Sequence, residues 1–153
     1  MRHQGLGSEL FSIVNGKVIG KGYDPTGFGN YIILKDTNTG EAFLYGHMSV
    51  INPLLDVGDT VVKGYYVGHE GETGNATGIH LHLEQQNLGS SDTWIFGQPI
   101  ENLENPALYL GIPNTYGISA IYYSTPIYTI SRERKKFPWV IYANKIRKRN
   151  NLT

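Results

Sequence analysis

Cysteine is absent from the 153 residues, which removes one way of stabilising a small domain. Without thiols the chain forms no disulfide and no thiolate zinc site, so any metal must be held by histidine, aspartate or glutamate. Long apolar runs are also missing, and none approaches the length needed to cross a bilayer. The first five residues lack the features of a secretory signal, so we expect export by another route or from a longer parent chain.

The formal net charge is also zero, because an acidic segment and a basic segment balance each other. Residues 1–131 carry five Lys or Arg against twelve Asp or Glu, a balance of −7, whereas residues 132–153 carry eight against one, a balance of +7. This segregation indicates two parts with different roles. We expect a domain over residues 1–110 and a C-terminal extension over residues 111–153 that ends in a basic, aromatic tail.

Two interpretations of the basic tail stay open. It binds a polyanion, such as teichoic acid, an anionic membrane or nucleic acid, or it is a solvated segment or short helix docked on the acidic domain. An anionic wall polymer or membrane is the partner we expect, and no specific nucleic acid is predicted.

Turn-forming and strand-forming residues are plentiful, with 19 glycines and 11 tyrosines. Short apolar runs are separated by turn signals such as Asn15-Gly16, and long helical periodicity is missing. We therefore predict a mainly β fold, a small antiparallel sheet domain with tight turns. Strands are expected at 10–14, 17–22, 31–35, 41–47 and, as the last of the sheet, 80–86; a capped helical turn is expected at 105–111 and an added hairpin at 118–130.

A loop of small and polar residues, 71–78, leads into a short run that carries His80 and His82. Alternate side chains of a strand share a face, so the two imidazoles lie together, with Cα atoms roughly 7 Å apart. Leu81 and Leu83 take the opposite face. This spacing suits one metal ligand beside an acid–base group, or two ligands. Ordinary structural histidines remain the alternative from this pair alone.

Four segments follow one another in a characteristic order: 45–49, 57–64, 71–78 and 80–84. Their order and spacing resemble those of the lysostaphin-type (LytM-like) zinc endopeptidases, which cut peptidoglycan peptides. The resemblance spans about residues 3–87. It implies the LytM-like peptidase fold, zinc as cofactor and a peptidoglycan peptide as substrate.

The resemblance also implies a role for each histidine of the pattern. His82 matches a zinc ligand, and His3 matches the first zinc ligand. His47 and His80 match two catalytic histidines beside the metal. His69 falls outside the pattern, and we expect it to be structural.

One family ligand is missing from the sequence. The aspartate ligand of the family should follow Leu6, but Gly7 stands there. Three explanations stay open: Glu9 replaces the aspartate, two histidines and a non-protein ligand hold the metal, or the domain has lost zinc. The four retained histidines favour a working enzyme.

We therefore predict a zinc endopeptidase that faces the cell wall or the outside of the cell and hydrolyses cross-links or stem peptides of peptidoglycan. The missing signal and the basic tail fit a bacteriophage lysin, carried by a virion or released on lysis. The alternative is a degenerate member that binds cell wall or regulates another hydrolase. A biotinyl or lipoyl carrier, suggested by residues 57–64, is disfavoured because the lysine-bearing tip segment is missing.

Overall fold

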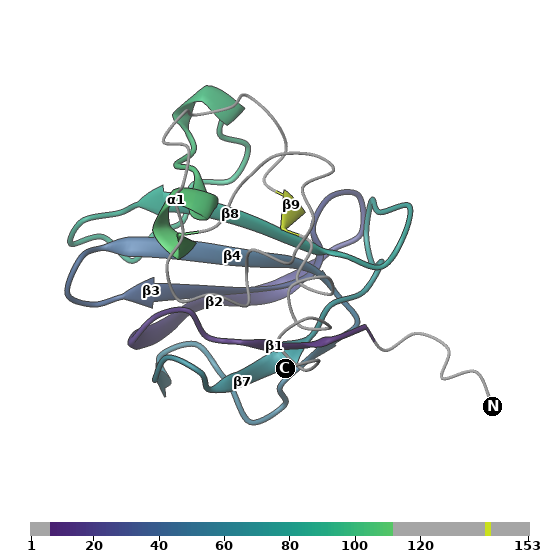
Figure 1. Cartoon of the computed structure of the whole chain (residues 1–153), viewed down its shortest axis with the longest axis horizontal. Helices are drawn as coiled ribbons and strands as arrows, with labels where there is room; N and C mark the ends of the chain where they lie inside the picture. Colours follow the sequence, from purple (N-terminus) through teal and green to yellow (C-terminus); the bar gives the residue numbers. More distant parts are fainter. Residues whose placement is uncertain (1–6, 112–139, 142–153) are drawn as a thin grey trace.

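The computed structural model describes residues 7–111 and 140–141, which form two antiparallel sheets (Figure 1). The larger sheet has the strand order β6-β2-β3-β4-β8-β9, and the smaller sheet has the order β1-β7-β5. The prediction of a mainly β fold is confirmed. The strands are β1 (Glu9–Phe11), β2 (Gly16–Asp24), β3 (Gly29–Asp36), β4 (Glu41–Met48), β5 (Val50–Ile51), β6 (Thr60–Val61), β7 (Tyr66–His69), β8 (Leu81–Asn87) and β9 (Val140–Ile141).

The main apolar core lies between the two sheets, and we call it the inter-sheet core. Side chains alternate along a regular strand, so alternate residues of β3 and β8 point toward the smaller sheet. The smaller sheet contributes Leu10 and Val67. The larger sheet contributes Val18, Ile32, Leu34, Phe43, Tyr45, Met48, Val61, Leu81 and Leu83. The opposite face of the larger sheet carries a smaller cluster of Ile33, Ala42, Leu44 and Trp94.

The strand expected at 10–14 is shorter than predicted and belongs to the smaller sheet. β1 pairs with β7, whereas β2 pairs with β3 and β6. The Asn15-Gly16 turn therefore takes the chain from one sheet to the other instead of closing a hairpin. Only glycine fits at Gly16, because a Cβ there would lie 1.7 Å from the carbonyl oxygen of Lys35.

The helical turn predicted at 105–111 is confirmed as α1 (Pro106–Leu110), which follows the short 3₁₀ helix η1 (Ile100–Asn102). The Asn105 side chain accepts a hydrogen bond from the Ala107 amide at 2.9 Å, and Gly111 ends the helix in the left-handed conformation, with φ 70°. No described helix is long and apolar enough to cross a membrane.

The strand carrying His82 is not the last strand of its sheet, contrary to our expectation. β9, from the C-terminal extension, pairs antiparallel with β8, and the register places Val140 opposite His82. The pairing was unforeseen because it joins residues about sixty positions apart, which no local pattern reveals. The hairpin expected at 118–130 lies outside the described residues.

Asp92 fastens the segment that follows β8 to the larger sheet. Its carboxylate accepts hydrogen bonds from Lys17 on β2 and from Lys35 on β3, the latter at 3.0 Å. Lys35 is only 4% exposed, so it depends on Asp92 and on the Ser91 carbonyl to satisfy its ammonium group. These contacts hold in place the segment that delivers Trp94 to the sheet.

This anchor predicts a pH-dependent contribution to stability. The hydrogen bonds from Lys17 and Lys35 hold the pKa of the Asp92 carboxyl below its ordinary value of 3.8. A lowered folded-state pKa gives a stabilisation that is present above pH 3.8 and lost as the pH falls through the lowered value. We expect Asp92→Asn to lower the urea midpoint of unfolding near neutral pH. The difference in midpoint between wild type and the variant should disappear below pH 3.8.

Urea unfolding from pH 2 to pH 7 checks this expectation. Asp56→Asn is the matched control, because the Asp56 side chain is 82% exposed where it pairs with Lys21 and should contribute little. A gap between wild type and Asp92→Asn that stays constant down to pH 2 would contradict the role given to Asp92.

Candidate active site

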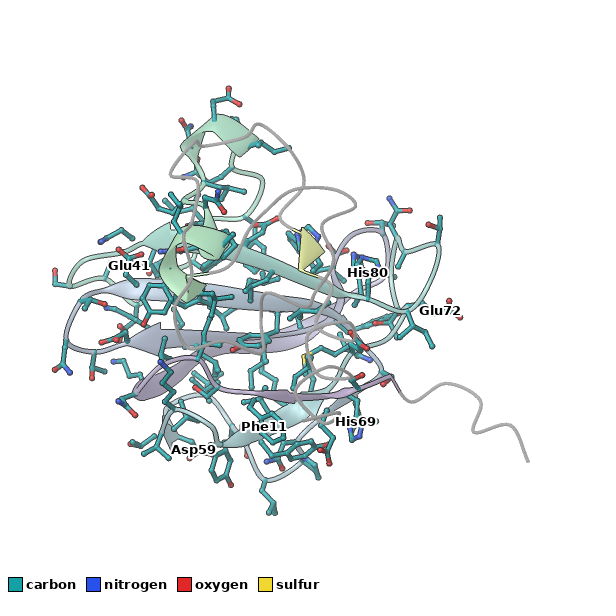
Figure 2. All side chains as sticks on the ribbon, in the orientation of Figure 1. Phe11, Glu41, Asp59, His69, Glu72 and His80 are labelled. Carbon is teal, nitrogen blue, oxygen red and sulfur yellow. The ribbon has the colours of Figure 1, made fainter. Side chains whose placement is uncertain are left out.

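Three of the four histidines predicted for the site come together in the structure. The ring centroids of His47 and His80 are 4.8 Å apart, and those of His47 and His82 are 5.4 Å apart. His47 stands near the end of β4, His82 lies on β8, and His80 immediately precedes β8. Figure 2 shows His80 where β8 begins and His69 apart from it, on the smaller sheet.

His47 reaches the site because β4 contains a bulge. The β3–β4 register pairs Asn30 with Met48 and Ile32 with Tyr45, so β4 has one extra residue. Tyr45 and Met48 both enter the inter-sheet core although they are three positions apart, which strict alternation forbids. His47 lies at this bulge and has the left-handed backbone conformation, with φ 58°. It is the only non-glycine residue with a positive φ in the described part of the chain. The bulge therefore turns His47 away from the core and toward the other histidines.

The 71–78 loop fixes the orientation of the His47 ring. The His47 Nδ1 atom lies 2.8 Å from the Thr73 carbonyl oxygen. Thr73 is itself held in place by two hydrogen bonds. Its hydroxyl donates to the Met48 carbonyl at 2.9 Å and accepts from the backbone N–H of Asn30 at 3.0 Å. Since a carbonyl only accepts, Nδ1 carries the proton, and the lone pair of neutral His47 is on Nε2.

His80 is held in the same way, by a carbonyl of the same loop. Its Nδ1 atom lies 2.8 Å from the Gly78 carbonyl oxygen, so its lone pair is also on Nε2. In the neutral form of each ring the lone pair thus lies on Nε2, and the two rings stand side by side. Each can accept a proton at Nε2 without breaking the hydrogen bond that positions it.

The charge state of His47 follows from its surroundings. Burial lowers the pKa of the His47 imidazole, and the neighbouring His82 and His80 lower it further, whereas the hydrogen bond to Thr73 acts in the opposite direction. The net shift is downward from the ordinary value of 6.5. His47 is therefore neutral near pH 7 and able to accept a proton.

The third imidazole, His82, has a carboxylate partner that the sequence analysis missed. Its Nε2 atom lies 2.9 Å from Glu84 Oε1, and its ring packs edge-on against Phe28, with centroids 5.4 Å apart. Phe28 continues into further aromatic contacts with Phe96, which also touches Tyr31. The period-two rule that paired His80 with His82 also places residue 84 on the same face, so the sequence contained this signal.

The structure does not bring Glu9 to the three histidines. Leu10 points into the inter-sheet core, so its neighbour Glu9 points outward from the smaller sheet. Leu81 and Leu83 fill the same core from the larger sheet, so His82 points outward from the opposite side. The core therefore separates the two side chains, and the idea that Glu9 replaces the missing aspartate finds no support in this geometry.

Glu9 instead belongs to a separate group on the smaller sheet. It pairs across the strands with His69, whose Nδ1 atom lies 2.7 Å from the Tyr66 hydroxyl. Burial raises the pKa of Tyr66, and the Glu9 carboxylate adds to this effect. The His69 ring is thus hydrogen-bonded within the smaller sheet.

The described residues show in part whether this site could hold a zinc ion. Among residues 7–111 and 140–141, no three His, Asp or Glu side chains are grouped to hold a metal. The donors present nevertheless suit zinc, because one nitrogen of His82 contacts a carboxylate and the other makes no hydrogen bond to the described residues. The second predicted ligand, His3, lies outside the described residues.

Comparisons with known proteins identify the family of this chain. The sequence model of peptidase family M23 matches residues 3–93. The glycyl-glycine endopeptidase ALE-1 of Staphylococcus capitis is 34% identical over 80 residues, 52% of this chain and 22% of that protein. Lysostaphin of Staphylococcus simulans is 34% identical over 80 residues, 52% of this chain and 16% of that protein. The chain thus matches about a fifth of the length of these relatives.

Solved structures extend the similarity beyond sequence. The catalytic domain of the antimicrobial peptidase lysostaphin from S. simulans superposes with a TM-score of 0.56 at 28% identity, covering 69% of this chain and 71% of that one. A mutant catalytic domain of the prophage-encoded M23 protein EnpA from Enterococcus faecalis superposes with a TM-score of 0.53 at 28% identity, covering 74% and 72%. The mainly β fold matches that of lysostaphin, and the chain belongs to peptidase family M23.

Proposed function

We propose that this protein is a zinc-dependent endopeptidase that hydrolyses peptides of bacterial peptidoglycan. The observation that carries the proposal is the pair His47 and His80, two imidazoles whose Nδ1 atoms are fixed by carbonyls and whose Nε2 atoms make no hydrogen bond within residues 7–111 and 140–141. They stand beside His82, the predicted zinc ligand. Hydrolysis of a peptide bond needs such groups to take a proton from water and to stabilise the oxyanion.

Zinc would be held by His82 together with His3. When bound, it supplies a Lewis acid that polarises the scissile carbonyl and makes water a stronger acid. Both protein ligands are neutral imidazoles, so the missing aspartate leaves the charge of the dication less balanced than in the family pattern.

The protein side of the reaction follows from the two tautomers. Neutral His47 accepts a proton from water at Nε2, because its lowered pKa keeps the ring unprotonated near pH 7. His80, once protonated at Nε2, keeps its bond to Gly78 and gains a second N–H. That N–H can donate to the carbonyl oxygen as negative charge develops there.

The relatives support the substrate class and the setting. ALE-1 is named a glycyl-glycine endopeptidase, and EnpA is described as prophage-encoded. We propose by analogy a wall-facing location, a phage origin, and an extension whose basic tail binds an anionic wall polymer or membrane.

A non-catalytic member of the same fold is the second candidate. It is favoured by one observation, that no group of three possible metal ligands exists within residues 7–111 and 140–141. Such a protein would bind wall peptides or regulate another hydrolase without zinc.

Zinc content and wall digestion together distinguish the two candidates. We expect close to one zinc per chain by elemental analysis, lost in His82→Ala because the substitution removes a ligand. We also expect release of new amino groups from purified peptidoglycan, abolished by a chelator and restored by zinc. Zinc-free protein that still binds the wall but releases no amino groups would establish the non-catalytic candidate.

A further inference from the structure

Glu84 makes a contact with His82 that the proposed catalytic roles leave unexplained. The two residues lie two positions apart on β8, so their side chains emerge on the same face. Glu84 Oε1 is 2.9 Å from His82 Nε2, and the two side chains are only 14% and 20% exposed. Water screens such a pair less than it screens a pair on the open surface.

The contact determines which nitrogen of His82 is available. An ionised carboxylate only accepts hydrogen bonds, so Nε2 must carry the hydrogen. In the neutral ring the lone pair then lies on Nδ1. A histidine that binds a metal through one nitrogen commonly donates its other N–H to a carboxylate, which orients the ring and strengthens the metal bond.

We propose that Glu84 is the positioning residue of His82: it holds His82 in the tautomer that offers Nδ1 to zinc, and it supplies through the ring the negative charge that the missing aspartate no longer supplies. This inference rests on the proposed function, because it assigns His82 to zinc. It assigns to Glu84 no contact with substrate or with the metal.

The proposal predicts the direction in which removal of the Glu84 carboxylate changes zinc affinity. If zinc is bound through Nδ1, removing the Glu84 carboxylate weakens zinc binding, by about 10–100-fold for loss of such a partner. If zinc is instead bound through Nε2, Glu84 competes with the metal for that atom. Removing the carboxylate would then strengthen zinc binding or leave it unchanged.

The experiment compares wild type with Glu84→Ala, Glu84→Gln and Glu41→Gln, by zinc competition against a chromophoric chelator. We expect Glu84→Ala to bind zinc about 10–100-fold more weakly. We expect a smaller loss for Glu84→Gln, because an amide oxygen still accepts from Nε2–H but carries no charge. Glu41 is the matched control, since its carboxylate also bonds to β8 residues, Gln85 and Asn87, and its substitution should leave zinc affinity unchanged.

A second measurement tests the tautomer in the metal-free protein. Long-range ¹H–¹⁵N spectra of histidine-labelled chain, recorded where His82 is neutral, should show the Nε2–H form for His82 in wild type. Glu84→Ala should show a mixture of both forms. The tautomer depends on the hydrogen bond between His82 and Glu84 and not on zinc. The measurement therefore remains possible for Glu84→Ala even if that variant binds too little zinc to measure.

The outcomes separate failure of this inference from failure of the proposed function. Wild type that binds zinc while Glu84→Ala binds it equally well or better would overturn the role of Glu84 and leave the peptidase proposal intact. An Nδ1–H tautomer of His82 in wild type would also overturn it. Wild type that binds no zinc would end both proposals together.

Discussion

Replacing His80 with alanine is expected to lower kcat/KM for peptidoglycan peptide cleavage by about 10²–10⁴-fold, the usual contribution of a general acid–base group. The reason is the fixed geometry of the ring, whose Nδ1 is held by the Gly78 carbonyl and whose centroid lies 4.8 Å from that of His47. His80 is half-exposed at the start of β8, outside the inter-sheet core, so its removal leaves the fold in place.

Zinc binding provides the second readout for this variant. His80→Ala should keep its zinc, because His82 is the ligand in the proposed site and His80 is not. Kinetics on a defined wall peptide and elemental analysis measure the two quantities on one preparation. Loss of zinc together with activity would show that His80 is a ligand, and full activity would remove it from the mechanism.

His69→Ala is the matched control for the kinetic experiment. It removes the same type of side chain from the smaller sheet, where the His69 ring is hydrogen-bonded to the Tyr66 hydroxyl. Its kcat/KM should stay within about twofold of wild type, because a group that does not touch the reacting atoms contributes little to transition-state stabilisation.

Replacing Phe43 with alanine is expected to lower the free energy of unfolding by about 3–5 kcal/mol, the range for a large aromatic deleted from a packed core. Phe43 is fully buried in the inter-sheet core, at 0% exposure. Its ring also packs against Tyr109 of α1, with centroids 4.7 Å apart. The substitution therefore leaves a cavity and loosens the contact that holds α1 on the sheet.

Urea unfolding of the two proteins checks this value. Phe96→Ala is the comparison, since Phe96 is 52% exposed and its removal should cost about 1 kcal/mol or less. A loss below about 1 kcal/mol for Phe43→Ala would mean that the core around β4 is not packed as described.

Local patterns were sufficient to place one half of the site. Period-two alternation put His80 and His82 on one face of a strand, and the structure shows both rings beside His47. The same rule places Glu84 on that face, although nothing in the histidine pattern singles it out. The fold itself was anticipated from the order of four motifs, and the mainly β architecture confirms it.

Long-range features were beyond local patterns. The position of His47 depends on a bulge that no alternation predicts, because strict period two would have sent its side chain into the core. The distribution of strands between two sheets depends on pairings such as Glu9 with His69, which are about sixty residues apart in the chain. That distribution is what removes Glu9 from the candidate ligands.

The left-handed backbone at His47 has a consequence for how this protein could evolve. A non-glycine residue held there costs about 1–3 kcal/mol of stability, offset by the surrounding structure. Glycine would adopt the same backbone without that cost. Selection for thermal stability alone would therefore favour glycine over His47. At this position, beside the other two histidines, the residue that suits the proposed activity is not the residue that gives the highest stability.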